Sequence, residues 1–113
     1  MTDQEINEKL AKAVGFKYVV PTGIIIDFWK YPDGYTDRIL PDFLNDMNAC
    51  LKWIVPELRR KGLTSMLCHY TEDGVKVMLS GYDMLASEWA ETMSRAFCLA
   101  ALKYFEEANN ESA

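Results

Sequence analysis

A long amphipathic segment near the end of the chain constrains the fold more than any other feature. Residues 87–107 carry apolar side chains at steps of three and four, which is the spacing of one helix face. The apolar positions are Met93, Ala96, Phe97, Ala100, Ala101, Tyr104 and Phe105. The sequence therefore predicts a helix of about five to six turns, with Ser87 as its N-cap and one face buried against another layer.

The composition indicates a compact domain and excludes several classes of partner. The chain has 113 residues, half of them hydrophobic, and we expect residues 1–113 to form a single domain. Seventeen acidic residues against twelve basic ones give a net charge of -5. This balance argues against nucleic-acid binding, which needs clustered Lys and Arg at the phosphates. No segment resembles a signal peptide or a membrane span, so we expect a cytoplasmic protein with no membrane partner.

The residues that usually carry catalysis or metal binding are sparse. Cys50, Cys68 and Cys98 lie in apolar surroundings, and we expect them to be reduced, structural thiols. A single histidine and no CxxC motif predict no metal site. Cys68 and His69 are neighbours on a predicted strand, so they face opposite sides and do not form a nucleophile–base pair. No glycine-rich phosphate loop is present either. We therefore expect a protein that is not an enzyme and has no cofactor.

The first third of the chain reads as a helix followed by a strand. Thr2 and Glu5 form a capping box at the start of the helix, and Gly15 is a natural stop at its end. Residues 23–29 include three consecutive isoleucines, which favour a strand buried largely on both faces.

A second helix is expected in the middle of the chain. It opens near Asp42 or Asn45 and closes at Gly62. Pro56 has no N–H for the helical hydrogen-bond ladder, so we expect a kink or a restart there.

Two strands, 63–70 and 75–80, are then joined by Asp73-Gly74, which is a hairpin signal. The order helix, strand, helix, hairpin, helix indicates an α+β domain. We expect a three-layer α/β/α sandwich, in which three helices cover a small antiparallel sheet of three to four strands.

Three segments together resemble the phage ABA sandwich domain, a family of small tailed-phage proteins. They are the acidic opening helix with its closing Gly15-Phe16, the segment Pro41-Asp42-Phe43 with Asp46, Ala49 and Trp53, and the stretch from Arg95 to Lys103. The resemblance covers most of the chain except the loop of residues 30–40. Pro56 and the longer middle loop depart from the family pattern. The resemblance implies a phage origin and the sandwich fold, and it implies no catalytic residues.

The loop that follows the first strand carries the candidate binding site. Aromatic rings stack on planar ligands, and basic side chains bind phosphate or carboxylate. The candidate ligand-binding residues are Trp29, Lys30, Tyr31, Tyr35 and Arg38, with His69 from the hairpin. The alternative is that the three aromatics of the loop simply close the end of the sheet.

The phage-like character and the aromatic–basic loop together suggest a function. We expect a non-enzymatic phage protein in the host bacterial cytosol that counters host defence by sequestering a nucleotide-derived signalling molecule. The alternative is a protein–protein interaction module that inhibits a host factor or forms a homo-oligomer.

Overall fold

The computed structural model describes the chain except residues 24–25 and 113, and it describes residues 110–112 by their backbone alone. The elements, in chain order, are α1 (Asp3–Ala13), β1 (Lys17–Val19), β2 (Phe28–Lys30), β3 (Thr36–Asp37), α2 (Met47–Ala49), the π-helical segment η1 (Cys50–Ile54), α3 (Val55–Arg60), β4 (Leu63–Thr71), β5 (Gly74–Gly81), β6 (Leu85–Ala90) and α4 (Met93–Ser112). The molecule is elongated, with principal extents of 50 × 34 × 23 Å.

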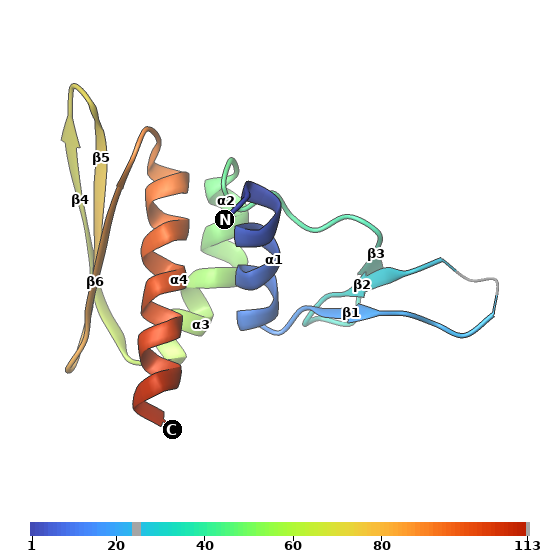
Figure 1. The fold of residues 1–113 in the computed structure, drawn as a ribbon. Coiled ribbons are helices and arrows are strands. Elements are labelled where there is room, and N and C mark those ends of the chain that lie inside the picture. Colours follow the sequence, from blue (N-terminus) through green and yellow to red (C-terminus); the bar gives the residue numbers. More distant parts are fainter. Residues whose placement is uncertain (24–25, 113) are drawn as a thin grey trace.

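The architecture is mixed α+β, as predicted, but its strands form two sheets. The larger sheet has the order β4-β5-β6 and the smaller one the order β1-β2-β3, and all pairs are antiparallel. Figure 1 shows α4 against one face of the larger sheet and the remaining helices on the far side of α4. We call these parts the body, and the β1-β2-β3 sheet that projects from it the arm. One sheet of three to four strands covered by helices in a three-layer sandwich is therefore not confirmed.

The opening helix follows its sequence signals. The Thr2 hydroxyl oxygen accepts a hydrogen bond from the Glu5 backbone N–H at 3.2 Å, which confirms the N-cap. Ile6 and Leu10 are buried, and α1 packs on α4. Gly15 lies just beyond the helix end with φ of +102°, the conformation expected of a glycine stop.

The second helix is continuous through three stretches and begins later than predicted. Asp46 is the N-cap, and its carboxylate accepts hydrogen bonds from the backbone of Asn48 and Ala49. The α-helix restarts close to Pro56, as predicted, because the π-helical segment η1 ends at Ile54 and α3 begins at Val55. A proline supplies no N–H to the carbonyl four residues back, and a wider turn accommodates that loss. Of the two predicted starts, Asn45 lies within one residue of the observed N-cap and Asp42 is too early.

The hairpin of β4 and β5 confirms the prediction from Asp73-Gly74. Its register pairs Thr71 with Gly74 and Leu67 with Met78, and Gly74 has φ of +153°. Residues along β5 alternate between a buried face and a half-exposed face. Val75, Val77 and Leu79 form the buried face, and α4 packs against β5.

The helix predicted over residues 87–107 is wrong at its start. Residues 85–90 form β6, which pairs with the second edge of β5, and the helix α4 begins only at Met93. Ser87 is therefore a strand residue opposite Met78 and not an N-cap. The Thr92 hydroxyl oxygen caps the helix instead, accepting from the Arg95 N–H at 3.3 Å. The edge of β5 gains a full row of ladder hydrogen bonds in this way, which outweighs the local helical pattern.

The rest of the amphipathic stripe on α4 forms the centre of the core as predicted. Its fully buried members include Ala96, Phe97, Ala100, Ala101 and Tyr104, with Cys98 beside them. The small alanines let the sheet and α1 approach α4 closely, while the aromatic rings fill the space between them. In the described part of the chain, no helix is long and apolar enough to cross a membrane.

The strand predicted over residues 23–29 is shorter and more exposed than expected. The observed strand β2 runs Phe28–Lys30, and residues 24 and 25 lie outside the described residues. Ile26 is 56% exposed and only Trp29 in β2 is buried. Burial on both faces is therefore wrong for the described part, because β2 pairs in the projecting arm and no second layer covers it (Figure 1).

Candidate functional site

The arm carries five of the six candidate site residues, and its first aromatic residue is used internally. Trp29 pairs with Tyr18 across β1 and β2, and their ring centroids are 5.1 Å apart. Only 7% of Trp29 is exposed. The indole therefore packs under Tyr18 and offers little open ring surface for stacking on a ligand.

Tyr31 joins the arm to the body. Its ring centroid lies 4.6 Å from that of Phe16 and 5.8 Å from that of Trp53, and its hydroxyl donates to the Ile39 carbonyl at 2.6 Å. Burial raises the pKa of Tyr31, and the nearby Asp37 carboxylate raises it further. The side chain thus remains neutral and acts as an anchor of the arm.

Tyr35 is the aromatic residue of the arm that stays open to solvent. It is 57% exposed and packs edge-on against Tyr31 at 5.1 Å. Its hydroxyl donates to an Asp37 carboxylate oxygen at 3.2 Å, and that negative charge raises the pKa of Tyr35. One face of this ring is free to contact a ligand, which neither Trp29 nor Tyr31 provides to the same extent.

Arg38 lies at the junction between the arm and α1. It lines a hollow of about 280 Å³ together with Trp29 and Leu40. The other lining residues are Gln4, Asn7, Glu8 and Ile39. Within the described part of the chain, Arg38 makes no ion pair or side-chain hydrogen bond. Its guanidinium is thus placed to meet an anion beside a mixed polar and apolar wall.

Lys30 lies on the other face of the arm, directly opposite Lys17 in the β1–β2 register. Both lysines and Tyr31 line a second hollow, of about 250 Å³. Like charges directly opposite one another destabilise a strand pair, and neither lysine has a salt bridge among the described residues. A bound anion would relieve this repulsion. Lys17 was missed at the sequence level because its only signal is the strand register, which depends on the fold.

His69 is not brought to the other five residues. It lies on β4 opposite Lys76, and its ring is edge-on to Trp89 with centroids 6.2 Å apart. Figure 1 shows β4 and the arm at opposite ends of the molecule. The structure therefore separates His69 from the candidate site on the arm.

The cysteines pack in the way that structural thiols do. Cys50 and Cys98 are fully buried with their sulfur atoms 3.6 Å apart, and the Cys50 thiol donates to the Phe43 carbonyl at 3.1 Å. The contact with Cys50 and burial raise the pKa of Cys98 far above its ordinary value. Cys68 pairs with Val77 and its neighbour His69 with Lys76, so the two point to opposite faces of the sheet.

Metal ligands are not clustered in the described part of the chain. Among those residues, no group of three or more His, Cys, Asp or Glu side chains is placed to hold an ion. The arm presents basic side chains that suit an anion at two separate hollows, Arg38 at one and Lys17 with Lys30 at the other.

Comparisons of this chain with protein-family models, with curated proteins and with solved structures give no match. The resemblance to the phage ABA sandwich domain stays a prediction, and the geometry of the arm carries the functional argument.

Proposed function

We propose that this chain is a non-enzymatic binding protein that captures a small, anionic, nucleotide-like ligand on its arm. One observation carries the proposal. Lys17, Lys30 and Arg38 each line a hollow on the arm, and none of them has an acidic partner among the described residues of a protein whose net charge is -5. Such basic side chains attract phosphate or carboxylate groups.

The hollow beside Arg38 suits a group the size of a sugar or a base. Its volume of about 280 Å³ is close to the lower end for small-molecule sites, which begin at roughly 300 Å³. Trp29, Ile39 and Leu40 supply apolar wall, and Gln4 supplies an amide group that donates to the Glu8 carboxylate in the same wall. Asn7 is already fixed, because its side chain bonds the backbone of Pro41 and Phe43, so the wall of the hollow is preorganised.

The resemblance to the phage ABA sandwich domain supplies the biological setting of the proposal. In that setting, the ligand is a nucleotide-derived signal of host defence, and the protein acts in the host bacterial cytosol by sequestering it. Sequestration requires affinity and no turnover.

Calorimetry with ADP-ribose, a cyclic dinucleotide and inorganic phosphate tests the proposal. We expect measurable binding of at least one nucleotide. Arg38→Ala should weaken it by about 10- to 100-fold, since a hydrogen bond to a charged group is worth about 1.5–3 kcal/mol. Lys30→Ala, which changes the separate hollow on the other face of the arm, should weaken it less. The matched control is Lys61→Ala, which removes an exposed basic residue beyond the end of α3 and should leave the affinity unchanged.

Two results would overturn the proposal. The first is the absence of heat with every ligand of the panel. The second is an equal loss of affinity in Arg38→Ala and Lys61→Ala, which would show a general effect of charge and no site on the arm. Melting temperatures of the three variants should match that of the wild type, because all three side chains are exposed and form no ion pair within the described residues.

A further inference from the structure

The free edge of the larger sheet lies on β4. In the order β4-β5-β6, β4 is hydrogen-bonded to β5 on one side only. Its other side faces no strand within the described part of the chain, as Figure 1 shows. With nine residues, β4 is also the longest strand described. An edge of this kind presents a row of backbone N–H and C=O groups to any strand that can pair with them.

The body covers β4 only in part, through contacts with α3 on the helix side. The helix α4 packs on β5 and β6, and β4 extends beyond it. As a result, Met66 and Tyr70 on the helix side are 39% and 65% exposed, and Leu67 on the opposite face is 61% exposed. Large apolar side chains are thus open to solvent on either side of an unpaired strand, which marks interaction surfaces.

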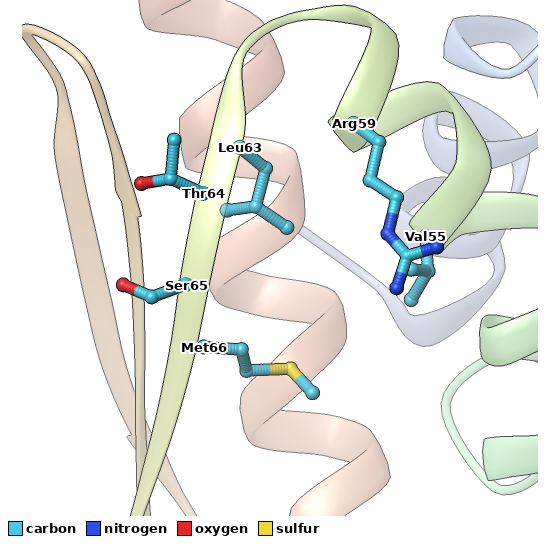
Figure 2. Close-up of a pocket in the computed structure, with 6 residues that line it drawn as sticks. All are labelled: Val55, Arg59, Leu63, Thr64, Ser65 and Met66. Carbon is cyan, nitrogen blue, oxygen red and sulfur yellow. The ribbon is translucent and has the colours of Figure 1, made fainter.

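A groove runs beside β4 on its helix side. It has a volume of about 130 Å³ and lies between β4 and α3. Figure 2 shows Leu63 and Met66 pointing from β4 toward Val55 and Arg59 of α3, while Thr64 and Ser65 point to the other side. A strand added to β4 would place alternate side chains over this groove.

The β4 edge also lacks the features that normally prevent pairing. Its sequence, LTSMLCHYT, contains no Lys, Arg, Asp, Glu or Pro. The opposite edge strand, β6, carries Glu88, which forms a salt bridge with Lys103 of α4 at 3.5 Å. In the arm, the edge strands carry Lys17 and Asp37. Of the edges described, β4 is therefore the one that is long and uncharged.

We propose that two copies of this chain pair antiparallel through β4 and form one continuous six-stranded sheet. A second copy is the occupant that fits, because pairing an uncharged strand with itself brings no like charges together in a protein of net charge -5. The register centred on Leu67 pairs the strand over its full length. In that register Met66 lies opposite Cys68 of the other copy, and Ser65 lies opposite His69.

The small size of this interface indicates a reversible dimer. A standard interface buries about 800 Å² on each partner, and one strand pair with its flanking side chains buries less. We therefore expect a dissociation constant of the dimer in the micromolar range. The site on the arm is not involved, so dimerisation and ligand capture succeed or fail independently.

Sedimentation velocity between about 1 and 200 µM tests the pairing. The wild type should shift from monomer to dimer with concentration, and Leu67→Lys should weaken association at least tenfold, because it places two like charges at the centre of the paired edge. Leu85→Lys is the matched control, since Leu85 is equally exposed but lies on β6. It should dimerise as the wild type does. Circular dichroism must show that both variants are folded.

Each other outcome of the sedimentation experiment counts against the proposal. A wild type that stays monomeric throughout the range overturns it. A loss of association in Leu85→Lys with none in Leu67→Lys also overturns it, because the copies would then associate through β6. Capture of a peptide strand from another protein by a chain that never dimerises would assign the edge to that partner instead.

Cross-linking tests the register. In a Cys68→Ser background, Leu67→Cys places two thiols opposite each other at the proposed two-fold axis, and mild oxidation should give a covalent dimer. Leu85→Cys in the same background should stay monomeric on a denaturing gel. A dimer in solution without a cross-link through position 67 would exclude the pairing centred on Leu67.

Discussion

The body and the arm are built from similar apolar and aromatic residues, yet only the body encloses them fully. In the body, α4 lies between a three-stranded sheet and the other helices, and Phe97 and Tyr104 are 0% and 1% exposed. In the arm, strands of two and three residues form a sheet that projects from the body, and Tyr18 and Tyr35 remain half exposed. The difference shows that a second layer, more than side-chain type, decides burial.

The two regions also differ in what holds them together. The body depends on contacts between segments that are distant in sequence, such as α1 with α4 and the sulfur contact of Cys50 with Cys98. The arm is attached through one aromatic cluster, in which Phe16 contacts Tyr31 and Trp53. A region with few buried contacts opens at lower free energy than a packed core.

The largest effect on stability should come from Phe97→Ala in the body. The ring is fully buried on α4, and its removal leaves a cavity that the close-packed layers cannot fill. We expect the free energy of unfolding to fall by about 3–5 kcal/mol. Denaturation by urea, followed by circular dichroism, measures the change. A loss below about 1 kcal/mol would contradict the picture of α4 as the central element of the body.

A smaller loss in the free energy of unfolding is expected for Gly81→Ala, which tests close packing at the edge of the same core. A Cβ at position 81 would overlap the Tyr104 hydroxyl and lie 2.9 Å from the Gly62 carbonyl oxygen. Since Tyr104 is buried and cannot move aside, overpacking should cost about 1–3 kcal/mol. Ser80→Ala is the matched control, and its stability in urea should equal that of the wild type within about 0.5 kcal/mol. Equal stability of the two variants would show that the core relaxes at this point.

The body was predicted better than the arm because its sequence patterns extend over more residues. The stripe from Ala96 to Phe105 and the turn at Gly74 each belong to an element of at least eight residues, and both were predicted correctly. The prediction for residues 87–90 was wrong because their local sequence pattern is helical. Their pairing with β5 is a tertiary interaction, which a local sequence pattern does not reveal. The arm was predicted only in part: a strand was expected over residues 23–29, but the pairing of strands of two and three residues with one another has no long local signal.

The positions of the candidate site residues could be predicted only in part, for a related reason. The loop after β2 was identified from its composition, and Arg38 and Lys30 do line hollows on the arm. Burial of Trp29 under Tyr18 depends on the β1–β2 register, and so does the position of Lys17 opposite Lys30. The separation of His69 from the arm depends on the whole fold. Distances between segments are tertiary facts, and composition alone does not contain them.

The buried thiols of the body should make the free energy of unfolding depend on pH, with an effect of intermediate size. Contact with Cys50 and burial raise the pKa of Cys98 above its ordinary value of 9.0. Above that pH the unfolded chain loses the thiol proton while the folded chain keeps it, so stability falls as the pH rises beyond about 9. The slope for one such thiol is at most about 1.4 kcal/mol per pH unit.

Urea denaturation at pH 8 and pH 10 measures this loss, and Cys98→Ala should remove part of it. The tyrosines of the arm, whose pKa values are also raised, contribute equally to both proteins and cancel in the comparison. Thiol titration of the native protein gives a second readout, in which half-buried Cys68 reacts before Cys50 and Cys98. Rapid reaction of all three thiols without unfolding would show that the body opens as easily as the arm.

The smallest effect should come from Tyr35→Ala in the arm. The ring is 57% exposed, makes one edge-on contact with Tyr31 and bonds Asp37 through its hydroxyl, so its loss leaves no enclosed cavity. We expect the free energy of unfolding to change by less than about 1 kcal/mol, as is usual for exposed positions. Hydrogen exchange should instead rise locally in residues 28–37, because the arm has few other contacts that hold it closed. A loss as large as that of Phe97→Ala would mean that arm and body unfold as one cooperative unit.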